Sequence, residues 1–215
     1  MSAAPLTALV LIGGRSSRMG RNKALLSLTE GGPPLVSLVV EALRPIADEV
    51  LLVGSDAEPY SFLDLPSVPD VYENAGSLGG IYSGLAAARN EHALAVACDM
   101  PFLNGGLLAF MASLPRDYDA LVPVLDEPEP MHAVYSKACL PLMKAQLEQG
   151  RYKIIGWFDR ARIQYIQREA VLEHDPKLRS FYNMNTPGEW AAARELYVGA
   201  ADAGQSNKKR AWDGP

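Results

Sequence analysis

Short apolar runs alternate with amphipathic stretches along most of the chain. The first clear run, Leu9 to Ile12, is short and partly β-branched, which is typical of a strand buried on both faces. Similar runs predict further strands at Glu49–Val53, Val68–Tyr72, Ala93–Cys98, Asp119–Val124, Met131–Ser136 and Ile163–Ile166. Apolar residues at helical spacing predict helices at Leu35–Leu43, Ile81–Arg89, Asn104–Leu114 and Pro141–Gln149, and a last helix between Pro187 and Val198.

This alternation of strands and helices predicts an α/β protein. We expect a three-layer α/β/α, Rossmann-like fold with a mostly parallel sheet, to which Met131–Ser136 adds an antiparallel pair. A chain of 215 residues fits one domain, which we place at residues 1–198. Residues 199–215 are poor in hydrophobic side chains, so we expect them to form a loose tail.

Composition and charge restrict the classes of partner. The chain is 48% hydrophobic and 21% charged, as in ordinary soluble proteins, and its net charge of −5 disfavours a general nucleic-acid binder. Residues 1–5 lack the charged start of a signal peptide, and no apolar stretch is long enough to span a bilayer. Cys98 and Cys139 fit small buried side chains in a reducing compartment. We therefore expect a cytoplasmic protein without a nucleic-acid or membrane partner.

The loop after the first strand carries the strongest candidate chemistry. Gly13 and Gly14 end the strand and allow the backbone to approach a ligand without an intervening Cβ. Hydroxyls and cations follow within the same loop, at Arg15, Ser16, Ser17, Arg18, Arg21 and Lys23. This combination suits a polyanion such as a nucleoside triphosphate, although the spacing matches neither a Walker A motif nor a dinucleotide fingerprint. The alternative is a basic surface turn.

Two aspartates lie where an open α/β sheet binds its ligands. Asp99 directly follows an apolar strand, a natural position for a Mg²⁺ ligand, although an aspartate there can also cap a helix or form a turn. Asp70 lies on the weaker strand Val68–Tyr72 and could accept hydrogen bonds from guanine. The glycine-rich stretch Glu73–Gly80 is predicted as a loop that approaches a ribose or base. Its Gly79 and Gly80 would alternatively serve tight helix–sheet packing.

Several motifs together resemble one family. They are Leu11–Lys23, Gly76–Gly80, Cys98–Pro101, His132–Tyr135 and Asn183–Pro187. In this order, over about residues 6–198, they resemble the molybdenum cofactor guanylyltransferases of the nucleotidyltransferase superfamily. The chain departs from the family pattern at four positions: the family usually has Ala at Ile12, Asp at Asn22, Pro at Ser77 and often a polar residue at Gly54.

The resemblance implies an activity and a set of site residues. The implied reaction transfers GMP from GTP to the terminal phosphate of molybdopterin and releases pyrophosphate, with Mg²⁺ held by Asp99. The implied catalytic residues are Arg15, Lys23 and Asp99. The implied nucleotide-binding residues are Leu11, Ile12, Gly13, Gly14, Arg15, Lys23, Gly54, Asp70, Gly79 and Asp99. Cofactor-handling or acceptor proteins are possible further partners.

A second set of residues is implied on the pterin side, namely His132, Arg151, Lys153, Asn183 and Asn185. Each has a structural alternative: a histidine on a strand is often part of the core, and the two asparagines could cap the last helix. Three other activities remain open, namely a molybdopterin cytidylyltransferase, a sugar-phosphate nucleotidyltransferase and a non-catalytic nucleotide sensor. The presence of both Lys23 and Asp99 argues against the sensor, which needs neither a metal nor neutralisation of a leaving group.

Overall fold

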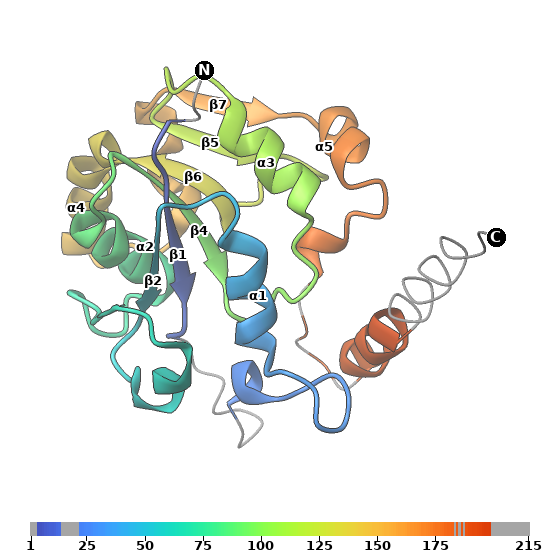
Figure 1. Ribbon diagram of the computed structural model, residues 1–215. Helices are drawn as coiled ribbons and strands as arrows, with labels where there is room; N and C mark the ends of the chain where they lie inside the picture. The colour runs from blue at the N-terminus through green and yellow to red at the C-terminus, as the bar shows by residue number, and fades with distance from the viewer. Residues whose placement is uncertain (1–3, 14–21, 183, 185, 187, 199–215) are drawn as a thin grey trace.

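A computed structural model describes residues 4–13, 22–182, 184, 186 and 188–198. In these residues seven strands form one sheet with the order β3-β2-β1-β4-β6-β5-β7 (Figure 1). The strands are β1 (Thr7–Leu11), β2 (Glu49–Val53), β3 (Ser67–Val68), β4 (His92–Ala97), β5 (Ala120–Pro123), β6 (His132–Ser136) and β7 (Ile163–Ile166). The neighbouring pairs β1–β2, β1–β4, β2–β3 and β5–β7 are parallel, whereas β6 is antiparallel to both β4 and β5. The mostly parallel sheet and its antiparallel pair are therefore confirmed.

Helices cover both faces of this sheet, which confirms the three layers. Helices α1 (Leu35–Leu43), α3 (Gly105–Ser113) and α5 (Arg168–His174) pack on one face, and α2 (Gly76–Ala87) and α4 (Leu140–Glu148) pack on the other (Figure 1). Residues 188–198 form the predicted last helix. None of the helices in the described part of the chain is long and apolar enough to cross a membrane.

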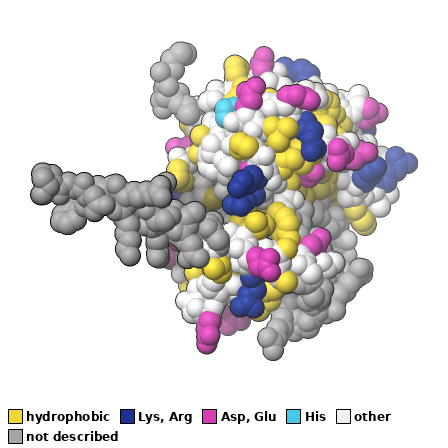
Figure 2. All heavy atoms as spheres, turned by 90° about the vertical axis from the view of Figure 1, so that its right-hand side faces the viewer, with side chains coloured by type: hydrophobic (Ala, Val, Ile, Leu, Met, Phe, Trp, Pro, Cys, Tyr) yellow, Lys and Arg dark blue, Asp and Glu magenta, His cyan; other side chains and the backbone are white. Residues whose placement is uncertain are grey.

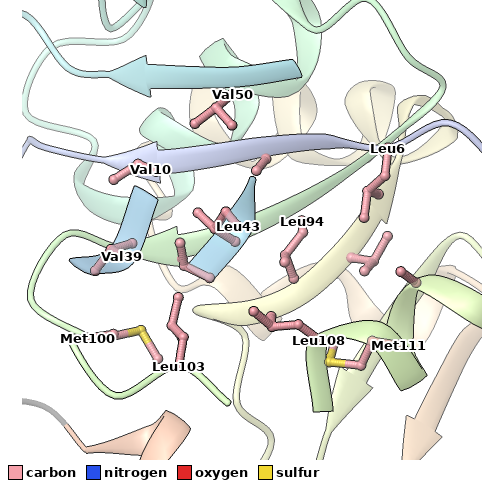
Figure 3. Packing of buried hydrophobic residues seen from close by; sticks show 14 of the residues in the cluster. Leu6, Val10, Val39, Leu43, Val50, Leu94, Met100, Leu103, Leu108 and Met111 are labelled. Carbon is pink, nitrogen blue, oxygen red and sulfur yellow. The ribbon is translucent and has the colours of Figure 1, made fainter. Parts of the chain in front are cut away.

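Strand β1 lies in the interior of the sheet, between β2 and β4, and faces a hydrophobic core on each side. Its Ala8 and Val10 belong to the core under α1 and α3, whereas Leu9 and Leu11 belong to the core under α2 and α4. Figure 3 shows the first of these cores, with Val10 and the helix and strand side chains around it. Burial on both faces explains why the sequence of β1 is continuously apolar rather than alternating.

Two of the sequence-based boundaries are wrong near the second glycine-rich stretch. Strand β3 ends at Val68 instead of continuing to Tyr72, because Pro69 has no N–H with which to extend the ladder. Asp70 therefore lies in a loop and not on a strand. Helix α2 begins at Gly76, so the last part of the predicted loop is the first turn of a helix. Helix α5 is an element that the sequence pattern did not predict.

The last helix packs against an early segment of the chain. Ala193 is buried with Leu28 and Leu35, and the Nε of Arg194 donates a hydrogen bond to the carbonyl of Leu28 at 2.9 Å. Figure 1 shows this helix beside the segment that precedes α1, and Figure 2 shows hydrophobic side chains interspersed with charges of both signs on that face. The C-terminal helix therefore covers the segment that follows Lys23.

Helix α2 approaches the sheet closely at Gly84, which gives a test of the packing. A Cβ at this position would lie 2.8 Å from Cγ2 of Val53 and 3.0 Å from both δ-carbons of Leu9. We expect Gly84→Ala to lower the free energy of unfolding by about 1–3 kcal/mol through overpacking, as measured by urea denaturation. The matched control is Gly105→Ala in α3, where a Cβ would meet no heavy atom within 4 Å. Equal unfolding free energies for the two variants would contradict this account.

Candidate functional site

The loops that follow β1, β2, β3 and β4 leave the sheet at the same edge. The N–H of Ile12 donates to the carbonyl of Val53 at 2.9 Å, and the N–H of Gly54 donates to the carbonyl of Val68 at 2.9 Å. On the other side, the N–H of Cys98 donates to the carbonyl of Leu11 at 3.2 Å. These bonds extend the parallel ladders by one step, so the predicted nucleotide-binding segments meet at the edge where such folds bind ligands.

Three glycines, Gly13, Gly54 and Gly80, form a cradle at this edge, which we call the glycine cradle. A Cβ at Gly54 would lie 2.8 Å from the N of Gly13 and 2.9 Å from Cγ1 of Ile12, and Gly54 has a φ of +154°. The backbone therefore requires glycine at position 54. The side chain of Ile12 also occupies space that a side chain at position 54 would need.

The carboxylate of Asp70 lies within the glycine cradle. Its Oδ2 is 3.3 Å from the position that a Cβ of Gly13 would occupy, and its Oδ1 is 3.7 Å from the corresponding position at Gly80. Burial raises the pKa of Asp70, and a hydrogen bond with the Ser55 side chain acts in the opposite direction. Because Gly80 also lies against Leu11, with 3.4 Å between the Cβ position and Cδ2, the glycines of α2 serve helix–sheet packing as well.

Asp99 and Lys23 lie near each other beside the end of β4. Asp99 is half-buried, and burial raises its pKa, whereas a backbone hydrogen bond and the positive charge of Lys23 lower it. Lys23 begins a short 3-10 turn, and its Nζ donates to the carbonyl of Met184 at 3.0 Å. The positive charge of Lys23 therefore acts on the carboxylate of Asp99 at this edge of the sheet.

The buried side chains of Tyr60 and Ser180 bind the segments next to Lys23 and Asp99. The amide of Asn22, next to Lys23, donates to the hydroxyl of Tyr60 at 2.9 Å, and Tyr60 is buried. After Asp99, the N–H of Asn104 donates to the hydroxyl of Ser180 at 2.8 Å. Tyr60 and Ser180 were missed by the sequence analysis, because a single tyrosine or serine has no local pattern that marks it as part of a site.

A comparison with known proteins identifies the family. Residues 8–163 match the model of the MobA-like NTP transferase domain. The chain belongs to this family. The chain is 36% identical to a Carboxydothermus hydrogenoformans protein named "Probable molybdenum cofactor guanylyltransferase". The 193 aligned residues cover 89% of this chain and 96% of the relative. A Pelotomaculum thermopropionicum protein of the same name is 34% identical over 191 residues, or 88% of this chain and 92% of the relative.

A solved structure gives the same assignment. The molybdopterin-guanine dinucleotide biosynthesis protein A of Archaeoglobus fulgidus superposes with a TM-score of 0.78 and 28% sequence identity, over 90% of this chain and 99% of that one. The predicted family and the predicted fold class are thereby confirmed. The MobA-like domain spans β1 to the start of β7, and thus contains the glycine cradle, Asp70, Asp99 and Lys23.

The donor set at this edge is compatible with Mg²⁺. Among the described residues no group of three or more His, Cys, Asp and Glu side chains could hold a metal ion by itself. Mg²⁺ in phosphoryl-transfer sites is typically held by one or two carboxylates together with water and substrate phosphates. A single half-buried carboxylate such as Asp99, on which the charge of Lys23 acts, fits this mode of binding.

The predicted pterin-side residues are not gathered at one place. Arg151 and Lys153 are exposed beyond the end of α4, where the side chain of Gln146 donates to the carbonyl of Lys153 at 2.5 Å. His132 lies in β6 with no exposed surface, and its ring is 4.9 Å from that of Phe181. The other predictions, Gly14, Arg15, Asn183, Asn185 and the tail at 199–215, lie outside the described residues.

The burial of His132 predicts a specific pH dependence of stability. Neither ring nitrogen has a hydrogen-bond partner among the described residues, and burial lowers the pKa of His132 from 6.5 to about 4, opposed in part by Asp175. Because the folded-state pKa lies below the unfolded value, the stabilisation is present above pH 6.5 and is lost as the pH falls towards 4. The loss over this window amounts to about 3 kcal/mol.

The matching variant is His132→Phe, which keeps an aromatic ring and removes the titrating group. We expect the variant to lose stability less steeply than the natural protein between pH 6.5 and 4, as measured by urea denaturation at a series of pH values. Parallel curves for the two proteins would show that His132 does not titrate in this way.

Proposed function

We propose that this protein transfers GMP from GTP to the terminal phosphate of molybdopterin, forming the guanine dinucleotide and releasing pyrophosphate. The observation that carries the proposal is the match to the MobA-like domain, in which the glycine cradle and Asp99 follow strands that end at the same edge and the charge of Lys23 acts on Asp99. The curated relatives named as molybdenum cofactor guanylyltransferases support this choice of donor and acceptor. Because many nucleotidyltransferases share this fold, the fold does not specify the acceptor. The names of these relatives are what suggest molybdopterin.

The reaction is a single displacement at the α-phosphorus of GTP. An oxygen of the terminal molybdopterin phosphate forms a bond to the α-phosphorus of GTP, and the bond between that phosphorus and the bridging oxygen of the β-phosphate breaks. Such transfers depend on positioning and on neutralising charge more than on covalent chemistry by the protein. No nucleophilic serine or cysteine is required, and burial raises the pKa of Cys98, the thiol next to Asp99, to about 12.

Each residue of the site has a role in this scheme. The backbone at Leu11, Ile12, Gly13 and Gly14, together with Arg15, would hold the phosphates, and Lys23 would neutralise the charge that develops on the leaving pyrophosphate. The bond from Lys23 to the Met184 carbonyl holds the ammonium group in place. Asp99 would hold Mg²⁺, which when bound lowers the negative charge of the triphosphate. Asp70 would accept hydrogen bonds from guanine within the glycine cradle.

The direct test compares the formation of the nucleotide-linked pterin with each nucleotide. The purified protein, Mg²⁺ and molybdopterin are incubated separately with GTP, CTP and ATP, and the nucleotide-linked pterin is identified by mass spectrometry. The proposal expects product with GTP far in excess of the other two. Preferential use of CTP would assign the protein to cytidylyl transfer, and product formation only with a sugar phosphate as acceptor would exclude molybdopterin.

The role of Asp99 is tested by Asp99→Asn. An amide binds Mg²⁺ much more weakly than a carboxylate, so we expect guanylyl transfer to fall by about 100-fold or more while thermal unfolding stays unchanged. Asp126→Asn is the control, because the side chain of Asp126 is 98% exposed and forms only a surface ion pair with Arg168. Near-normal turnover of Asp99→Asn at saturating Mg²⁺ would remove Asp99 from the mechanism.

The role of Lys23 is tested by Lys23→Ala. Removing one electrostatic group from a site of this kind typically costs about 100-fold in kcat, or about 3 kcal/mol of transition-state stabilisation. The matched control is Lys144→Ala, since Lys144 is exposed and pairs with Glu148 on the surface of α4. Kinetic constants within a factor of about three of the natural protein for Lys23→Ala, well under 1 kcal/mol, would show that Lys23 is only a surface charge.

A further inference from the structure

Helix α2 contains a buried serine whose hydroxyl makes two hydrogen bonds. Ser83 is 1% exposed, and its Oγ donates to the carbonyl of Gly79, one turn earlier in the helix, at 2.7 Å. The same oxygen accepts a hydrogen bond from the N–H of Val71 at 2.9 Å. A serine in a helix commonly bonds to the carbonyl of the preceding turn. The second bond is different, because it ties the helix to the loop that follows β3.

The bond to Val71 holds the residue directly after Asp70. The strand ladder has already ended at Val68, and Pro69 has no N–H to contribute. The side chain of Val71 is 63% exposed, whereas the ring of the next residue, Tyr72, packs against the core at 5.4 Å from that of Tyr82 in α2. The Ser83 hydroxyl is the group that joins the backbone directly beside Asp70 to helix α2 by a hydrogen bond.

The position of the Asp70 carboxylate depends closely on this attachment. Its Oδ2 lies against Gly13 and its Oδ1 faces Gly80, with 3.3 and 3.7 Å to the Cβ positions of these glycines. The Ser55 side chain also bonds to the carboxylate, but from the loop that follows β2. Hydrogen bonds weaken over a few tenths of an ångström, so a small displacement of the loop changes what the carboxylate can bind.

We infer that Ser83 is a positioning residue that sets the guanine selectivity of the site by fixing Asp70 against α2. The inference rests on the proposed function, since it assumes that Asp70 accepts the N1–H and the 2-amino group of a bound guanine. A correctly placed carboxylate can accept both donors with its two oxygens. When the loop is released from α2, the carboxylate can still meet N1–H but no longer meets both donors in good geometry. The hydrogen bond from the 2-amino group to the carboxylate is then weaker.

The experiment compares GTP with inosine triphosphate, which lacks only the 2-amino group. We expect the natural protein to prefer GTP by about tenfold or more in kcat/KM, the range for one hydrogen bond to a charged acceptor. Ser83→Ala should reduce this preference to about threefold or less while the protein remains folded, because alanine is a good helix former. Calorimetric titration measures the preference in binding as the ratio of the two dissociation constants, without the need for turnover.

A matched control separates positioning from a general loss of packing. Ser136 is also a buried serine, 5% exposed, whose hydroxyl accepts from a backbone N–H, that of Ala138, and donates to Glu91. It lies in β6 opposite His92, at the start of β4 and thus at the far end of the sheet from Asp70. Ser136→Ala should keep the natural GTP-to-inosine-triphosphate ratio.

The double variant decides whether Ser83 acts through Asp70. Asp70→Ala alone should remove the preference for GTP, and adding Ser83→Ala should change the ratio no further, because the group that Ser83 positions is absent. A natural ratio in Ser83→Ala, or a natural protein that binds both nucleotides equally, would overturn the inference. A protein that prefers GTP in binding but forms no dinucleotide with molybdopterin would instead contradict the proposed function and leave the inference standing.

Discussion

The in-register parallel pairing of β1 with β2 and β4 is the constraint on which the site depends. Leu11 pairs with Val53 on one side and with Ala97 on the other, so all three strands end at the same level. The backbone bonds from Ile12 and Cys98 then continue the ladders into the loops. A slip of one residue in either pairing would turn the buried side chains of β1 to the wrong faces, and the two cores would not tolerate it. The hydrophobic core therefore fixes where Gly13 and Asp99 lie.

Steric limits at this edge then select the small residues. The chain passes so closely at Gly13 and Gly54 that a Cβ at Gly54 would overlap the backbone, and Ile12 fills the remaining space. Position 54 is thus glycine for a local steric reason. In the proposed site it would offer only its backbone to a base. The side chain available in the glycine cradle for that role would be the carboxylate of Asp70.

The sequence predicts elements well where a single pattern determines them. Helix α1 and strand β2 have the predicted bounds. The apolar stripe of α1 is followed by Pro45, and the apolar run of β2 is followed by Gly54. Helix α2 begins earlier than predicted, since its start contains Gly76, Gly79 and Gly80, which have low helix propensity; a Cβ would be crowded at Gly79 and would touch Leu11 at Gly80. The chemistry of Asp99 and Lys23 is visible in the sequence, but their proximity is not. Groups such as Tyr60, Ser83 and Ser180 act through long-range hydrogen bonds, which leave no periodic signal.

The C-terminal segment shows how far apart in sequence the parts of one site can be. Met184 accepts from Lys23, Ser180 accepts from the N–H of Asn104 in the loop after Asp99, and Arg194 donates to Leu28. One stretch of chain thus contacts both the segment that carries Lys23 and the loop that carries Asp99. Because a lysine side chain loses considerable rotamer entropy when it is fixed, the bond to the Met184 carbonyl places that cost in folding rather than in substrate binding. Residues near the end of the chain, before and within the last helix, therefore hold both the segment that carries Lys23 and the loop that follows Asp99.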